Sequence, residues 1–142
     1  MKITVQQIIE AAVRIEGTVE RTPLQYNKRL SNLYQAKIYI KREDLQEVRS
    51  YKIRGAYNKI ASLSDEEKKR GVVAGSAGNH AQGVAYSCSH LKIHGTIFMP
   101  TATPIQKIGR VKHFGGEYVT IKLTGRTYDE STHAAHAYAK EH

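Results

Sequence analysis

The stretch Ser50-Tyr51-Lys52-Ile53-Arg54-Gly55-Ala56 organises the rest of this sequence. Before it, residues 37–43 alternate between polar and apolar side chains, which is typical of a strand. After it, small and apolar residues recur at helical spacing as far as Leu63. Ser50 is a favourable N-cap, so the sequence predicts a helix that has Lys52 in its first turn.

Lys52 has the surroundings of a nucleophilic amine. A helix N-terminus disfavours a cation by about 0.3–1 kcal/mol, and Arg49 and Arg54 add positive charge nearby. Both effects favour the neutral amine that Schiff-base chemistry requires. Taken alone, however, the stretch is explained more simply by a first-turn lysine that points into water.

A second stretch, Gly75-Ser76-Ala77-Gly78-Asn79-His80-Ala81-Gln82-Gly83, follows the apolar run at residues 72–74. A strand, a glycine-containing turn and a helix N-terminus in this order make an anion site from backbone N–H groups. Ser76, Asn79 and His80 offer side-chain donors around the same anion. Because Gly-x-x-Gly spacing is weak evidence by itself, an ordinary loop capped by serine explains this stretch equally well.

Together the two stretches resemble the fold-type II pyridoxal-phosphate enzymes, and among these the threonine dehydratases, also called threonine deaminases. Further stretches in the expected order extend the resemblance from about residue 5 to the end of the chain: Arg21-Thr22-Pro23-Leu24, Lys41-Arg42-Glu43-Asp44-Leu45-Gln46, Phe98-Met99-Pro100 and Lys112-His113-Phe114-Gly115-Gly116.

The resemblance implies a role for each matching residue. Lys52 is implied to carry pyridoxal 5'-phosphate and to act as the general base. Asn79 matches the residue that hydrogen-bonds the 3′-oxygen of the cofactor, and Tyr51 replaces a phenylalanine whose ring packs against the pyridine. The substrate carboxylate is implied to lie in the loop formed by Ser76, Ala77, Gly78, Asn79 and His80.

The implied reaction converts L-threonine to 2-oxobutanoate and ammonia. The sequence of residues 41–52 is more similar to that of the biosynthetic enzymes of isoleucine synthesis than to that of the degradative ones. Serine dehydratase and serine racemase remain alternatives, since one methyl group is worth only about 1–3 kcal/mol in a pocket. A folded interaction module that uses this scaffold without catalysis is the non-enzymatic alternative.

The fold class predicted for the chain is α/β, an open parallel sheet with helices on both faces. Ligands of such sheets bind beyond the carboxyl ends of the strands, where Gly75 lies. By resemblance, residues 1–51 belong to a large domain and residues 52–142 form a small domain of a longer enzyme. The expected strands are 37–41, 71–75, 94–99 and 117–122, and the expected helical segments are 4–15, 27–36, 51–62, 64–67, 79–90, 104–113 and 126–141.

Composition narrows the class of protein. The 142 residues, 40% of them hydrophobic, suit one compact domain, and neither a membrane span nor a signal peptide is expected. A single cysteine, Cys88, suits a reducing compartment, so the cytoplasm is the expected location.

Neither nucleic acid nor metal is an expected partner. The net charge is +9, but Lys and Arg are dispersed and lack interleaved aromatic residues. His133 and His136 are three residues apart without supporting Cys or acidic ligands, so solvent-facing side chains are expected rather than a metal site. The expected partners are a small amino-acid substrate and, in the complete enzyme, further copies of the same chain.

Overall fold

A computed structural model describes residues 2–142, which form a three-layer α/β unit with an N-terminal arm. The central sheet is parallel and has the order β3 (Val72–Gly75), β4 (Gly95–Met99), β5 (Val119–Leu123). Val72 pairs with Gly95, which pairs in turn with Val119. The parallel sheet predicted from the sequence is therefore confirmed.

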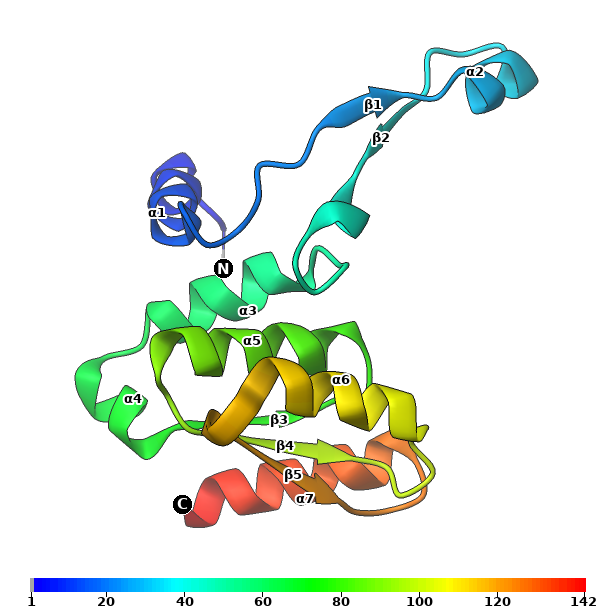
Figure 1. Cartoon of the computed structure of the whole chain (residues 1–142). Helices are drawn as coiled ribbons and strands as arrows, with labels where there is room; N and C mark the ends of the chain where they lie inside the picture. Colours follow the sequence, from blue (N-terminus) through cyan, green and yellow to red (C-terminus); the bar gives the residue numbers. More distant parts are fainter. Residues whose placement is uncertain (1) are drawn as a thin grey trace.

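Helices cover both faces of this sheet (Figure 1). On one face lie α3 (Lys52–Ala61), α5 (Asn79–Leu91) and α6 (Ile105–Gly115), while α7 (Tyr128–Glu141) packs across β3 and β4 on the other. The core forms where the apolar sides of these elements meet; its buried side chains include Ile60, Val84, Cys88, Ile97, Met99 and Val111. This arrangement confirms the predicted layers.

Local signals set the ends of several helices. The short α4 (Asp65–Arg70) begins with a reciprocal capping box between Ser64 and Glu67. Pro104 precedes the first residue of α6, and α6 ends before Gly116, whose φ of +53° is a conformation that favours glycine. A 3-10 turn, η2 (Gly116–Tyr118), then leads into β5.

The N-terminal part begins with α1 (Val5–Ile15), capped by Thr4, and continues into an arm that extends from the body (Figure 1). The arm pairs β1 (Leu24–Tyr26) with β2 (Tyr39–Lys41) in antiparallel fashion and has α2 (Lys28–Tyr34) at its end. A 3-10 turn, η1 (Glu43–Leu45), leads back toward α3. The sequence did not predict β1, because it has three residues and pairs with a partner about 15 positions away.

Large apolar side chains on α1 and the arm are exposed within residues 2–142. None of the helical residues of α1 is buried, and Ile8 is 60% exposed. The other exposed apolar residues of this part are Ile3, Val5, Ile9, Val13, Leu24, Tyr26, Leu33, Tyr34, Tyr39 and Ile40.

No helix in residues 2–142 has both the length and the apolar character that crossing a bilayer requires.

Candidate functional site

Lys52 is the first residue of α3, and its side chain is exposed. Its Nζ atom lies 5.1 Å from the centroid of the Tyr51 ring, close enough for a cation–π contact. The first-turn position predicted for Lys52 is confirmed. The predicted N-cap is shifted by one residue: Tyr51 occupies that position, and Ser50 Oγ instead accepts a hydrogen bond from the Lys52 N–H at 3.2 Å.

A polar network fixes the turn before this lysine to its helix. Arg54 donates to Glu43 through Nε at 2.9 Å and through Nη2 at 2.8 Å, so the pair is bidentate. Thr22 and Gln46 also donate to the Glu43 carboxylate. These contacts lower the pKa of Glu43 to about 2, chiefly through the Arg54 hydrogen bonds. The network therefore joins the arm, η1 and the first turn of α3.

The loop after β3 lies at the carboxyl end of the strand and opens α5. The Ser76 N–H donates to the Phe98 carbonyl at 3.0 Å, which anchors the loop to β4. Ser76 itself is buried, and its Oγ accepts from the Gly78 N–H at 3.4 Å. Gly78 is the N-cap of α5, and no side chain of residues 2–142 caps this end. The first-turn N–H groups of α5 are therefore available to an anion.

Packing of α3 against α5 brings Lys52 and this loop to one place. The backbone of Gly83 in α5 faces the backbone of Lys52 so closely that a Cβ atom there would lie 3.2 Å from the Lys52 carbonyl. His80 lies one turn earlier on α5. Partial burial lowers the pKa of His80, and the positive charge of Lys52 lowers it further. Asn79, the first residue of α5, is exposed beside it.

The site residues predicted from the sequence thus lie on two adjoining helix N-termini. One supplies an accessible lysine amine and the other supplies open N–H groups with the Asn79 amide, so the donor set fits an amino acid bound next to an aldehyde cofactor. The residues on this chain fit pyridoxal phosphate at the lysine. Ala77 lies in the same loop. The Gly78 N–H donates to the Ser76 hydroxyl, so this hydroxyl serves the loop itself.

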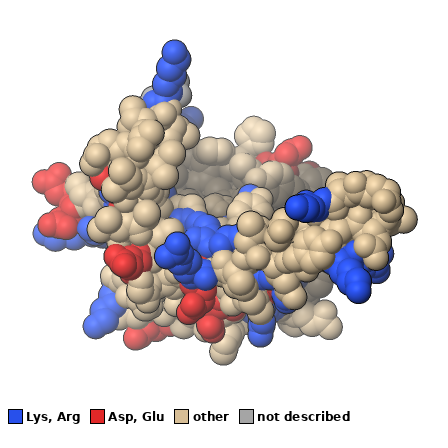
Figure 2. Space-filling view, turned by 90° about the horizontal axis from the view of Figure 1, so that it is seen from above, with Lys and Arg blue, Asp and Glu red and all other residues tan. Residues whose placement is uncertain are grey.

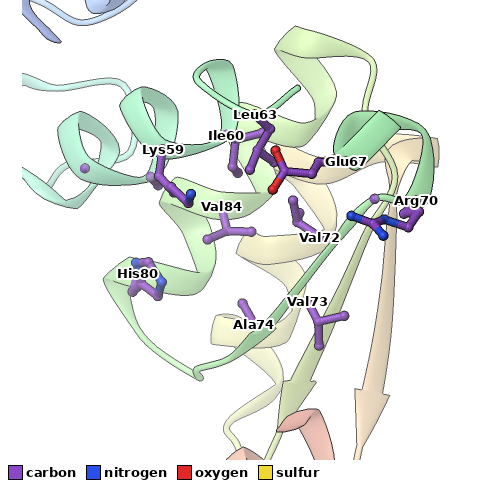
Figure 3. Close-up of a pocket in the computed structure, with 13 residues that line it drawn as sticks. Lys59, Ile60, Leu63, Glu67, Arg70, Val72, Val73, Ala74, His80 and Val84 are labelled. Carbon is purple, nitrogen blue, oxygen red and sulfur yellow. The ribbon is translucent and has the colours of Figure 1, made fainter. Parts of the chain in front are cut away.

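A hollow of about 370 Å³ lies between α3, α4 and β3 (Figure 3). His80 lies at one end of it and Arg70 at the other, with Ile60, Val72 and Val84 between them. Its lining does not include Lys52 or Asn79. This hollow follows the edge of β3 and reaches the loop of residues 76–80 at His80.

Basic side chains and the two histidines of α7 lie at the surface. On the face shown in Figure 2, Lys and Arg form separated groups with acidic and neutral side chains between them. His133 and His136 are exposed on α7. Among the residues that the structure describes, no three His, Cys, Asp or Glu side chains gather where a metal ion would need them.

A family model described as pyridoxal-phosphate dependent enzyme matches residues 15–142. The chain belongs to this family. Two L-threonine dehydratases named biosynthetic IlvA are similar to it: that of Halalkalibacterium halodurans, 54% identical over 141 residues, and that of Bacillus subtilis, 56% identical over 128 residues. The matches cover 99% and 90% of this chain, but 34% and 30% of the relatives. The chain therefore spans about a third of the length of the curated relatives it matches.

Solved structures agree with this assignment. The processed form of threonine deaminase isoform 2 from Solanum lycopersicum has a TM-score of 0.82 at 38% identity, and maize serine racemase has 0.90 at 31% identity. Each match covers 99% of this chain, with 39% and 42% of the respective solved chains. The predicted family and fold are confirmed.

Two features of the site were missed by the sequence analysis. The bond between Glu43 and Arg54 spans 11 positions and follows no local periodicity, although both residues lie in the motifs that carry the resemblance. Gly83 was quoted only as the end of the loop motif. A glycine inside a helix is unfavourable without a packing reason, and that is the signal that points to it.

Proposed function

We propose that this chain forms the N-terminal third of an enzyme that uses pyridoxal phosphate to convert L-threonine to 2-oxobutanoate and ammonia. The observation that carries the proposal is the close packing of the Lys52 backbone against α5, whose N-terminus is open and whose first turn carries His80, a residue that the Lys52 charge acts on. The printed names of the similar dehydratases support the choice of threonine and a biosynthetic role.

Each residue has a role that its position supports. When bound, pyridoxal phosphate supplies an electron-withdrawing ring that stabilises negative charge on the substrate Cα. Lys52 would hold the cofactor, and its amine, when not bonded to the cofactor, would accept the proton from Cα. The first-turn N–H groups of α5 bind the substrate carboxylate, which the helix dipole also favours. Asn79 donates from its amide toward the cofactor, and Tyr51 offers an aromatic face beside Lys52.

We also propose that residues 52–142 are a small domain and that residues 1–51 pack on a larger one. The exposed apolar face of α1 and the arm supports the second part of this proposal. Hollows lie on both sides of β3, one under α3 and one beside α7, and both are lined in part by Val72 and Val73. Because β3 is the first strand in the sheet order, one of its edges has no partner strand among residues 2–142. This open edge is suited to pairing with a further strand of the complete enzyme.

The test is a chimera in which this chain replaces the matching third of the H. halodurans dehydratase. We expect the chimera to bind pyridoxal phosphate and to form 2-oxobutanoate from L-threonine. Lys52→Ala should abolish turnover and the absorbance of the lysine-bound cofactor while the fold, measured by circular dichroism, is retained. Turnover with a normal cofactor spectrum in Lys52→Ala would refute the role of Lys52.

The similarity to maize serine racemase supports a second candidate function, in which the enzyme acts on serine. The two candidates are separated by supplying L-threonine and L-serine to the chimera and measuring 2-oxobutanoate, pyruvate and D-serine. A preference for L-serine with D-serine as product would replace the threonine assignment. Location in the cytoplasm and assembly into a homo-oligomer belong to the same proposal; the buried, unpaired Cys88 is consistent with a reducing compartment.

A further inference from the structure

Gly83 lies in the interior of α5, at the point where this helix comes closest to the first turn of α3. A Cβ atom at Gly83 would be 3.2 Å from the carbonyl carbon and oxygen of Lys52 and 3.2 Å from the Ile53 nitrogen. All three atoms are backbone atoms, so no side chain can rotate away to make room. A methyl group at this position would push the two helices apart by a few tenths of an ångström.

The surroundings of the contact leave little freedom to absorb that change. The Ile53 side chain, next to Lys52, is completely buried, so the first turn of α3 is anchored in the core. The Ser87 hydroxyl, also completely buried, donates to the Gly83 carbonyl at 2.7 Å. Protein interiors are closely packed, so a shift of one helix relative to the other carries its side chains with it.

The residues affected by such a shift are those of the site. His80 and Asn79 precede Gly83 by three and four positions, so all three share one face of α5. Lys52 is the residue contacted on the other helix. Glycine destabilises a helix interior relative to alanine, so its presence here needs a reason, and close approach of two backbones is a sufficient one.

We propose that Gly83 is a positioning residue that sets the distance between the Lys52 amine and the substrate loop on α5. Its missing side chain lets the backbone of Lys52 approach the helix that carries Asn79 and His80. The proposal deepens the function proposed above and rests on it for its catalytic consequence, but its geometric part does not depend on turnover.

The geometric part is tested by NMR on the 142-residue chain without cofactor. The pKa of His80 is measured in the parent and in Lys52→Gln, and the difference reports how strongly the Lys52 charge acts on His80. We expect removal of that charge to raise the pKa of His80. The difference should be smaller when Gly83→Ala is also present, because the lysine then lies farther from α5.

Gly109→Ala is the matched control, because Gly109 is also inside a helix and a Cβ atom there meets nothing within 4 Å. In that background the effect of Lys52→Gln on His80 should equal the effect in the parent. An undiminished effect in the Gly83→Ala background would overturn the proposal. So would an absence of any effect of Lys52→Gln in the parent.

The catalytic part is tested in the chimera. This test also applies if Gly83→Ala prevents the 142-residue chain from folding, since the NMR measurement would then not be possible. The content of cofactor-bearing Lys52 is measured by borohydride reduction and peptide mass spectrometry, and kcat is expressed per labelled site. We expect Gly83→Ala to lower kcat per labelled site by up to about 10-fold, because the shift is a fraction of the ~1 Å misplacement that costs about 100-fold, with a smaller change in KM. Gly109→Ala should match the parent.

If Gly83→Ala reduces only the number of labelled sites and leaves kcat per site unchanged, Gly83 has a packing role and the proposal is wrong. A chimera without any turnover, combined with the expected NMR result, would instead contradict the proposed function and leave the positioning by Gly83 supported.

Discussion

Replacement of Glu43 by glutamine should weaken the join between the arm and α3. The carboxylate accepts two hydrogen bonds from Arg54 and one each from Thr22 and Gln46. Glu43→Gln removes the charge that Arg54 pairs with and presents an amide N–H where donors already converge. The volume of the side chain is nearly unchanged, so the effect reports the charge and its hydrogen bonds.

The expected magnitude follows from the pKa. A fall from an ordinary value of 4.5 to about 2 corresponds to an upper limit of ~3 kcal/mol, since each pKa unit is worth about 1.4 kcal/mol. The Arg54 side chain is 32% exposed and the Glu43 side chain 16%, so solvent screens part of this interaction. We therefore expect Glu43→Gln to lower the free energy of unfolding by about 2 kcal/mol at pH 7.

The assay is urea unfolding of the 142-residue chain, followed by circular dichroism at several pH values. The folded-state pKa of Glu43 is depressed, so its contribution is complete above pH 4.5 and is lost as the pH falls toward about 2. The difference between parent and Glu43→Gln should accordingly shrink on acidification. Asp44→Asn is the control, because Asp44 is 58% exposed in its pair with Arg42 and its replacement should cost clearly less than Glu43→Gln. Equal costs for both substitutions, or a difference that persists at low pH, would refute the reasoning.

Three further predictions concern the site and the core. In the chimera, Asn79→Ala should remove about 2–4 kcal/mol of transition-state stabilisation, measured as a fall in kcat/KM, because a donor beside developing charge is lost. Unchanged kcat and KM for threonine would make Asn79 a structural residue. The 142-residue chain alone should form no 2-oxobutanoate from threonine with added pyridoxal phosphate, because it spans only about a third of the length of the dehydratases it matches; saturable turnover that Lys52→Ala removes would contradict this. Burial raises the pKa of Cys88 to about 12, so iodoacetamide should label it about three orders of magnitude more slowly in the folded chain than in urea; similar rates would show that α5 opens readily.

Much of the structure of residues 52–142 was predictable because its signals are local. The alternation of short apolar strands with amphipathic helices identified β3, β4 and β5 and their order in the chain, and glycine or proline marked several helix ends. Lys52 and the loop from Ser76 to His80 were found in the same way, since each motif is a continuous run of residues. The family resemblance supplied their roles and the division at residue 52, which periodicity alone does not contain.

Local residue patterns predict the parallel α/β fold, the lysine at a helix start and the glycine-containing loop at a strand end, because periodicity and capping act over a few residues. The contacts between these elements are set by tertiary packing. The pairing of β1 with β2, the bond between Glu43 and Arg54 and the contact of Gly83 with Lys52 join positions far apart in the chain. Each depends on the packing of one element against another, which no local pattern of residues specifies.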